Sequence, residues 1–329
     1  MPGAPRALHR SIGRGVATAV TACCLLAVTG CGSTASHSSA TSTPKRSAVR
    51  KLQIGGAPIG LLAYGGRLWV ADAKNNRVLR VDPESGKVTG QIAVGRTPLR
   101  IVAFRNSIWS TDFRAGTVSQ VSPSGMRRLA TIRVGPQPEG IVAFGPDLWI
   151  VSQQNGELVR VVPGDSGPAN RVAIGDQPRQ VTAGGGFLWV SVSGDNTVAE
   201  VDPRTRRVVA RIQACVGPQG LTYAAGRIWV GCTNDGVLAE IDPATRRVVR
   251  RTAYNAADAV TNTGSEVRVT SDSGPSTAVL DPHTGALSHK VQLSDGFIGD
   301  ANADVVSTNG AIWVSSPDEG VVYRLPTDG

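Results

Sequence analysis

Short apolar runs separated by turn-forming residues fill the chain from residue 49 onward. Residues 55 to 95 show one complete unit, GGAPIGLLAYGGRLWVADAKNNRVLRVDPESGKVTGQIAVG. It holds four runs of four to six residues, rich in Val and Ile and bounded by Gly, Asn, Asp and Pro. Runs of this length and composition predict β-strands, and the residues between them predict tight turns. The unit therefore predicts a four-stranded antiparallel sheet.

This unit recurs with a period near 40 residues. An Asp-Pro turn after the third run marks several copies, and its Asp is expected to accept backbone hydrogen bonds. A Trp in the second run is the clearest marker, and the chain's six Trp all occupy this position: Trp69, Trp109, Trp149, Trp189, Trp229 and Trp313. The 84 residues between Trp229 and Trp313 leave room for one more copy, with Arg268 in place of Trp. One Trp per copy predicts packing between neighbouring sheets rather than a stacking surface.

Seven four-stranded copies at this period predict an all-β, seven-bladed β-propeller over residues 49–329. The last copy ends at its third run, Val321 to Leu325. The missing fourth run matches VRKLQIG, Val49 to Gly55, at the other end of the repeats. We therefore expect the ring to close by pairing of this N-terminal strand with the last blade, which removes an open sheet edge.

The period, the GxxP start, the WV strand and the VxxVDP strand resemble bacterial YVTN-type propellers. More loosely, they are similar to the seven-bladed streptogramin (virginiamycin B) lyases. This resemblance covers residues 49–329 and is specific for architecture. Because propellers host binding proteins, lyases and lactonases, it leaves the function open.

The first 48 residues predict targeting rather than fold. Arg6, Arg10 and Arg14 precede an apolar run at 16–30 that is too short for an ordinary membrane span, as in a signal peptide. The sequence VTGC at 28–31 resembles the lipobox of bacterial lipoproteins. The resemblance implies a signal peptide over 1–30, lipidation of Cys31 and anchoring on the outer face of the cell membrane. Residues 31–48, rich in Ser and Thr, are expected to form a flexible tether.

Two Cys remain beyond the tether, Cys215 and Cys232. Cys23 and Cys24 lie in the predicted signal peptide, and Cys31 is the predicted lipidation site. The repeat register places Cys215 before the first strand of the fifth blade and Cys232 at the end of its second strand, on the same face. Two Cys in an extracytoplasmic protein therefore predict one disulfide.

The charge of +9 is concentrated at the N-terminus. Five of the 34 Lys and Arg lie in residues 1–48, which contain no Asp or Glu, so 29 basic residues face 25 acidic ones in the rest of the chain. This balance, with no nucleic-acid-binding motif, argues against a nucleic-acid partner. We expect a monomer.

A binding site, if present, is expected where each blade's first strand begins and its second ends. The residues there vary between copies while the frame repeats, as a binding surface or an unconstrained loop would show. A mixed ring of charged and amide side chains favours a polar or zwitterionic ligand. The candidate residues are Arg100, Glu139, Arg179, Gln180, Gln219, Asp258 and Asp304.

Two classes of function remain open. The first is a membrane-anchored, extracytoplasmic module that binds a protein, glycan or small ligand without cofactor or metal. The second is a metal-dependent lyase or lactonase that uses mouth carboxylates such as Glu139 and Asp304. The lyase resemblance implies a central site with His, yet the repeats hold only His283 and His289, both placed on the outer part of the sixth blade. No CxxC or HExxH motif occurs. These features favour the first class and predict no catalytic residues.

Overall fold

The computed structural model describes residues 49–262, 266–273, 276–293, 303–308 and 310–326. The predicted signal peptide at 1–30, the tether at 31–48 and Cys31 lie outside these residues. A contact-based division separates residues 1–45 from a unit that spans Arg46–Gly329. Within the described residues, no helix has the length and apolarity needed to cross a membrane.

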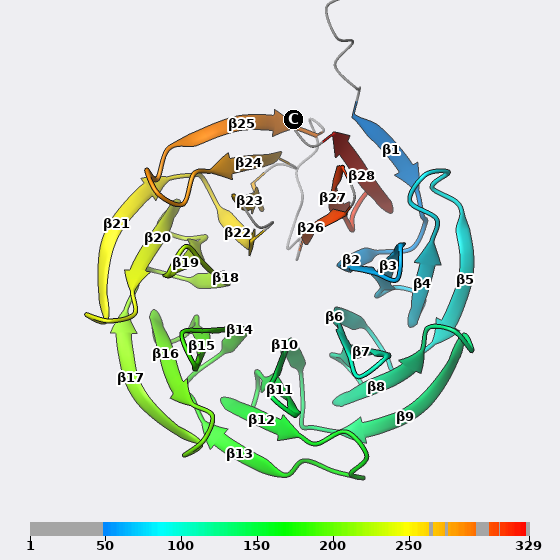
Figure 1. The fold of residues 1–329 in the computed structure, drawn as a ribbon, viewed down its shortest axis with the longest axis horizontal. Helices are drawn as coiled ribbons and strands as arrows, with labels where there is room; N and C mark the ends of the chain where they lie inside the picture. The colour runs from blue at the N-terminus through cyan, green and yellow to red at the C-terminus, as the bar shows by residue number, and fades with distance from the viewer. Residues whose placement is uncertain (1–48, 263–265, 274–275, 294–302, 309, 327–329) are drawn as a thin grey trace, which may run out of the picture. The chain divides into compact units, whose positions relative to one another are not determined.

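Seven four-stranded antiparallel sheets form a closed β-propeller, as predicted (Figure 1). The first strand of each blade in space lies innermost, and the fourth forms the rim. Blades 1 to 3 comprise β2 (Pro58–Tyr64), β3 (Arg67–Asp72), β4 (Arg77–Val81), β5 (Val88–Ala93); β6 (Pro98–Phe104), β7 (Ser107–Asp112), β8 (Thr117–Ser122), β9 (Arg127–Arg133); and β10 (Pro138–Phe144), β11 (Asp147–Ser152), β12 (Glu157–Val161), β13 (Asn170–Ala173).

The other four blades follow the same plan. Blades 4 to 6 comprise β14 (Pro178–Gly184), β15 (Phe187–Val192), β16 (Thr197–Asp202), β17 (Arg207–Gln213); β18 (Pro218–Ala224), β19 (Arg227–Cys232), β20 (Val237–Asp242), β21 (Arg247–Ala253); and β22 (Ala257–Asn262), β23 (Val267–Ser271), β24 (Ser276–Leu280), β25 (Leu287–Gln292). Blade 7 comprises β26 (Val305–Thr308), β27 (Ala311–Ser316), β28 (Val321–Pro326) and β1 (Arg50–Gln53).

Blade 7 closes the ring with strands from both ends of the described chain. β1 pairs antiparallel with β28, and the register runs from Arg50 opposite Arg324 to Gln53 opposite Val321. An ion pair of 2.9 Å joins the side chains of Lys51 and Glu319 beside this pairing. The N-terminal strand therefore covers the edge that β28 would otherwise expose.

The core consists of apolar layers between successive blades. Trp69 of blade 1, for example, packs in one cluster with Ile101 and Ile108 of blade 2. The six Trp are each at most 2% exposed, and each clusters with residues of the next blade around the ring. In blade 6, Arg268 is buried at this position and its guanidinium lies 2.8 Å from the Glu266 carboxylate. The buried charge of Arg268 is therefore balanced by Glu266.

The Asp-Pro turns contain the expected hydrogen bonds. The Oδ1 atoms of Asp82, Asp202, Asp242 and Asp281 accept backbone N–H groups two residues further on. Backbone hydrogen bonds are the main reason that the pKa values of Asp82, Asp202 and Asp281 lie below the usual range for aspartate.

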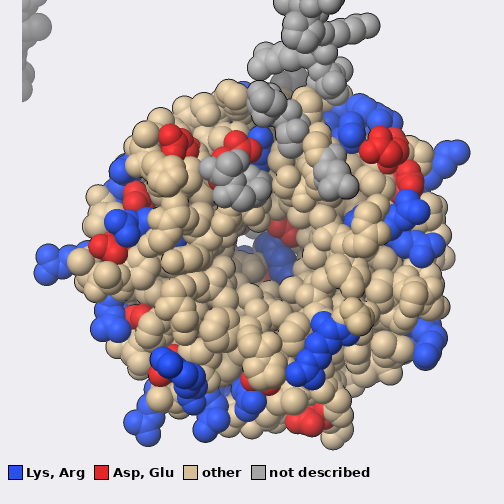
Figure 2. Space-filling view, viewed as in Figure 1, with Lys and Arg blue, Asp and Glu red and all other residues tan. Residues whose placement is uncertain are grey.

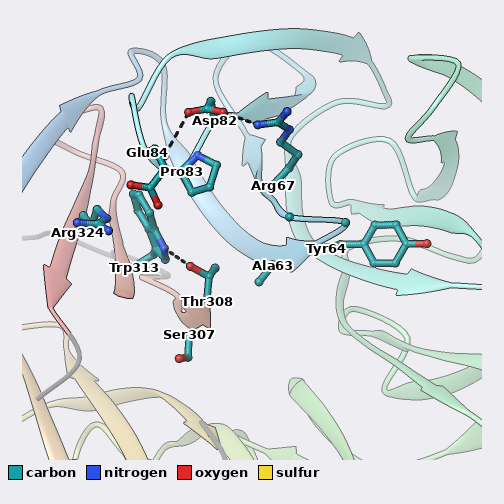
Figure 3. Close-up of a pocket in the computed structure, with 12 residues that line it drawn as sticks. Ala63, Tyr64, Arg67, Asp82, Pro83, Glu84, Ser307, Thr308, Trp313 and Arg324 are labelled. Atoms are coloured by element: carbon teal, nitrogen blue, oxygen red, sulfur yellow. Dashed lines mark hydrogen bonds and ion pairs between the residues drawn. The ribbon is translucent and has the colours of Figure 1, made fainter. Parts of the chain in front are cut away.

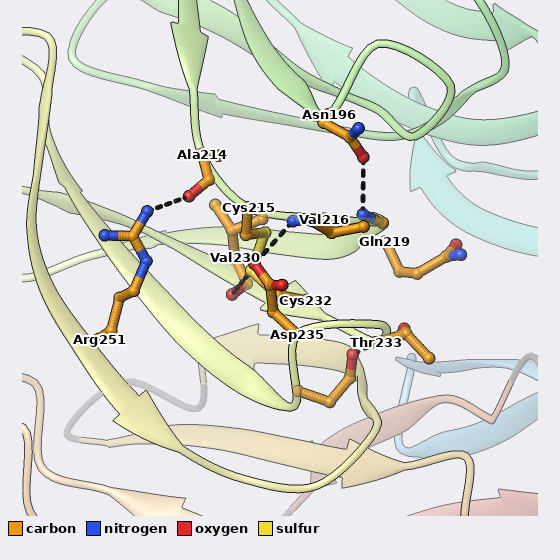
Figure 4. Close-up of a disulfide and its surroundings, with 12 residues drawn as sticks. Asn196, Ala214, Cys215, Val216, Gln219, Val230, Cys232, Thr233, Asp235 and Arg251 are labelled. Carbon is orange, nitrogen blue, oxygen red and sulfur yellow. Dashed lines mark hydrogen bonds between the residues drawn. A yellow bond between two sulfur atoms is a disulfide. The ribbon is translucent and has the colours of Figure 1, made fainter.

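A disulfide joins Cys215 and Cys232 in blade 5, as the register predicted (Figure 4). The two Cys are 17 residues apart, and the crosslink ties the loop before β18 to the end of β19. Closing a loop of this length stabilises a fold by roughly 3 kcal/mol in the chain-entropy account. In blades 1 and 3 the residues equivalent to Cys232 make the same connection by hydrogen bonds, from Ala57 N–H to Asp72 and from the Ser152 hydroxyl to Pro136.

Replacing Trp229 with Ala tests the packing between blades 5 and 6. Trp229 is fully buried against Ala257, Val260 and Val269. We expect the variant to lose about 3–5 kcal/mol of unfolding free energy, as for other buried Trp truncations. Chemical denaturation measures this loss. Val249→Ala on β21 of the same blade is the control, because Val249 is 52% exposed and its truncation should change stability by less than about 0.5 kcal/mol. Equal losses for the two variants would contradict the packing role.

Candidate functional site

The seven candidate residues lie at the beginnings of inner strands of blades 2 to 7, around the axis of the ring. We call this set the central mouth. Arg100 is on β6, Glu139 on β10, Arg179 and Gln180 on β14, Gln219 on β18 and Asp258 on β22, and Asp304 directly precedes β26. Figure 2 shows a hollow at the centre of the ring in which basic and acidic side chains are visible. The propeller thus brings together residues that are up to 204 positions apart, Arg100 and Asp304.

An irregularity in strand pairing presents these side chains. The register between first and second strands shifts just after the leading residue of blades 1 to 6, for example between Pro138 and Ile141. Neighbouring inner strands approach closely here. A Cβ added to Gly140 would meet the Gln180 backbone at 2.8 Å, and one added to Gly220 would meet the Asp258 backbone. Glycine is therefore required at these two positions, because a side chain would collide with the neighbouring inner strand.

Hydroxyl groups on second strands hold this irregular backbone. The Thr111 Oγ1 donates to the Glu139 carbonyl at 2.8 Å, and the Ser315 Oγ donates to the Ile59 carbonyl at 2.7 Å. Each bond reaches the inner strand of the next blade. The sequence interpretation missed these positioning residues. Their signal is a hydroxyl residue two places after the Trp, a position where other copies carry Ala71, Val151 or Gly231.

Arg100, Gln180 and Asp304 form one group in the mouth. The guanidinium of Arg100 lies 3.8 Å from Asp304 Oδ2. With the Gln180 amide oriented to satisfy its neighbours, its oxygen accepts from Arg100 Nε at 2.7 Å. Asp304 also accepts backbone N–H groups, from Leu61 at 3.0 Å and Val305 at 2.9 Å. Its carboxylate therefore links the mouth to the inner strands of blades 1 and 7.

Glu139, Arg179 and Gln219 form a second group in the mouth. The Glu139 side chain is 2% exposed and lies 3.5 Å from Arg179 Nε. Arg179 Nε also donates to Gln219 Oε1 at 2.8 Å, and Gln153 Nε2 donates to Glu139 at 3.3 Å. Burial raises the pKa of Glu139, and the positive charges of Arg179 and Arg100 partly offset that rise. Arg179 therefore stabilises a carboxylate that would otherwise be buried without a counter-ion.

Asp258 is a buried acid with a second carboxyl group beside it. It is 4% exposed, and its Oδ2 atom has no hydrogen-bond partner among the described residues. Burial raises the pKa of Asp258 well above its usual range, and the charge of Asp272 and a hydrogen bond with it raise the pKa further. Arg100 and Arg179 act in the opposite direction. The two carboxyl groups therefore share a proton more readily than they ionise together.

A cavity of about 210 Å³ lies along the axis next to these groups. Arg100, Gln180 and Asp304 supply polar lining, while Leu61, Ile141 and Leu221 supply apolar walls from blades 1, 3 and 5. A few convergent polar groups above an apolar wall are the usual composition of a small-molecule site.

The structure also places the residues relevant to catalysis. His283 lies in the turn after β24, and His289 lies on the outer strand β25, so neither is at the mouth. Among the residues that the structure describes, no group of three or more His, Cys, Asp or Glu has the arrangement of a metal site. Glu139 and Asp304, the carboxylates considered for a metal-dependent reaction, pair with Arg179 and Arg100 respectively.

Replacing Asp258 with Asn tests the raised pKa. Between the ordinary aspartate pKa near 3.9 and the raised folded value, folded protein keeps a proton that the unfolded chain has lost. The unfolding free energy of the wild type should therefore fall as pH rises through this window, by about 1.4 kcal/mol for each pH increment of one. D258N carries an uncharged amide at this position, so its unfolding free energy should fall less than that of the wild type as pH rises. Denaturant titrations from pH 4 to 8 measure this, with the exposed Asp165→Asn as control. Parallel wild-type and D258N curves would contradict it.

Comparisons with known proteins show the fold and not a family. No protein-family model and no curated protein sequence matches the chain. Virginiamycin B lyase from Staphylococcus aureus is similar in structure, with a TM-score of 0.71, 14% identity and coverage of 85% of this chain and 99% of the lyase. A catalytically inactive variant of that lyase with quinupristin gives 0.69 at 15% identity, covering 85% and 99%. Hydrazine synthase from Kuenenia stuttgartiensis gives 0.72 at 15% identity, covering 84% and 97%. The chain is thus a seven-bladed propeller like that of virginiamycin B lyase.

Proposed function

We propose that this protein is a binding module on the outer face of the cell membrane, and that the central mouth binds a small polar or zwitterionic ligand. The observation that carries the proposal is the convergence of Arg100, Arg179, Glu139, Asp258 and Asp304 from five different blades on the central mouth. Arg100 and Asp304 of this set line the axial cavity. Burying carboxyl groups such as those of Glu139 and Asp258 is unfavourable, and loop ends that only contact solvent would have no reason to bury them.

The charge of the mouth limits the ligand. Two guanidinium groups face three carboxyl groups, and burial together with the neighbouring Asp272 raises the pKa of one of them, Asp258. The mouth thus contains both signs of charge. A ligand with one cationic and one anionic group, or with several hydrogen-bonding groups, complements it better than a polyanion. A short peptide or a substituted sugar fits this description.

In this proposal, a lipid anchor holds the mouth outside the cell. Its support is the resemblance of residues 28–31 to a lipobox and the Ser- and Thr-rich composition of 31–48. The disulfide agrees with a compartment outside the reducing cytoplasm.

A metal-dependent lyase or lactonase is the second candidate. It is favoured by Asp258, because a carboxyl group with a raised pKa retains the proton that a general acid donates. Chelator-sensitive turnover of a lactone by the purified protein would favour this candidate over the first.

Neutralising the mouth cations tests ligand binding. In the double variant R100Q/R179Q, loss of two charge-assisted contacts, each worth about 1.5–3 kcal/mol, should weaken binding by well over tenfold. Photo-crosslinking on intact host cells, followed by mass spectrometry of the captured molecules, compares the variants. R171Q is the matched control, because Arg171 forms its ion pair with Glu157 on the rim of blade 3. Unchanged capture by a folded R100Q/R179Q protein would exclude the mouth as the binding site.

Replacing Cys31 with Ser tests the anchor. Metabolic labelling with an alkyne fatty acid should mark the wild-type protein and leave C31S unlabelled, because the predicted acceptor thiol is lost. C24S, with its change inside the predicted signal peptide, should stay labelled. Mass spectrometry should find Cys31 at the mature N-terminus. Equal labelling of C31S and wild type would overturn the lipidation site.

A further inference from the structure

A second cavity lies at the seam where the ring closes, between blades 7 and 1 (Figure 3). Its volume is about 390 Å³, and we call it the seam cavity. It is lined by the turn after β2, the turn after β4 and residues of β26, β27 and β28. Because strands alternate in direction, these turns lie on the face opposite the central mouth. The seam cavity is therefore separate from the site of the proposed function.

Comparison with blades 1 to 4 shows which side chains the seam lacks. The last residue of β2, β6 and β10 is aromatic, and Tyr64, Phe104 and Phe144 each pack in the layer facing the next blade. Blade 4 has Gly184 here, but Tyr223 from blade 5 occupies the space. Blade 7 has Thr308, and blade 1 offers only Ala63 at the position of Tyr223. Neither side of the seam therefore fills the layer.

Arg324 faces this volume, and its guanidinium forms no ion pair in the part of the chain that the structure describes. Its Nε atom is buried and has no hydrogen-bond partner among the described residues. The guanidinium lies 5.7 Å from the centre of the Trp313 ring, which supports it from one side. A buried, unsatisfied guanidinium nitrogen is unfavourable unless a ligand accepts from it.

Equivalent residues in other blades do have partners. Arg160 pairs with Asp147 on its second strand at 2.7 Å, and Arg80 donates to Thr89 on its fourth strand at 3.1 Å. Blade 7 offers neither. Ala311 stands at the position of Asp147, and Arg50 lies directly opposite Arg324 on the fourth strand.

The lining of the seam cavity holds two arginines and two acids, and Arg50, which donates to the Glu84 carbonyl at 3.2 Å, adds a third positive charge beside it. Arg67 pairs with Asp82, which also receives backbone N–H groups of its own turn. This pair leaves Arg324 and Arg50 against Glu84, whose side chain is exposed. Thr308 Oγ1 accepts the Trp313 indole N–H at 3.0 Å and donates to no other described residue, so its proton can be donated into the cavity.

The geometry points to the seam cavity as a binding site for a small organic carboxylate, held by Arg324 and the Thr308 hydroxyl. The planar fork of an arginine matches a carboxylate in a bidentate contact. The apolar surfaces of Ala63 and Pro83 would cover the remainder of the molecule. The volume fits a molecule of about the size of an amino acid or a small dicarboxylic acid.

NMR of the arginine Nε–H groups tests this with succinate as the probe and succinamide, at matched ionic strength, as the uncharged comparison. The Arg324 signal should shift saturably with succinate and not with succinamide. R324M should raise the apparent Kd, measured from the succinate dependence of Tm, by at least tenfold. R80M is the matched control, because Arg80 occupies the same register position with partners in its own blade, and it should bind succinate as the wild type does.

Glu84→Gln and phosphate separate the remaining outcomes. E84Q removes the exposed acid that lines the cavity and should tighten succinate binding. Loss of binding in E84Q, with binding retained in R324M, would overturn an anion site. Saturation by inorganic phosphate without saturation by succinate would overturn the assignment of a carboxylate. A linear, salt-like response of the Arg324 signal would overturn the site itself.

Discussion

The packing of each blade against the next is the interaction on which this structure depends. A four-stranded sheet with two apolar faces cannot bury both alone, and here each Trp is covered by the side chains of the next blade. Such a chain of layers has two bare ends unless the last sheet meets the first. Pairing of β1 with β28 joins these ends within one sheet, so the layer that covers Trp313 is made by blade 1. Closing the ring and burying the core therefore depend on the same contacts.

The mouth follows from the same constraint. Seven inner strands that converge on one axis bring their first residues into contact, and Gly140 and Gly220 allow that approach. The backbone cannot complete its ladder there, so hydroxyls such as those of Thr111 and Ser315 provide the missing hydrogen bonds. Side chains freed from the regular alternation of a strand then point to the axis. Variation at these positions changes the side chains at the mouth without altering the core.

Departures from the repeat mark the places where the seven blades differ in chemistry. Blade 5 uses a disulfide where blades 1 and 3 use hydrogen bonds of Asp72 and Ser152. Blade 6 buries Arg268 with a counter-ion in place of Trp. The seam has Thr308 in place of an aromatic side chain, and Ala311 and Arg50 stand where other blades carry partners of the residue equivalent to Arg324. Equivalent positions in the other blades thus show what each of these residues replaces.

Local pattern was sufficient to predict the blades, their number, the closing strand and the disulfide, because strand alternation and a 40-residue period are properties of the sequence itself. The mouth residues could be named from their register, but their partners could not. Arg179 lies near Glu139, which is 40 residues away in the sequence, and Asp258 lies near Asp272. The pKa values of Glu139 and Asp258 are raised by burial, which only the packed blades create. The seam cavity depended wholly on tertiary structure, since it is a volume left between Thr308 and Ala63, residues 245 positions apart. A sequence determines which residues alternate and repeat, whereas side-chain packing across the closed ring determines which spaces remain open.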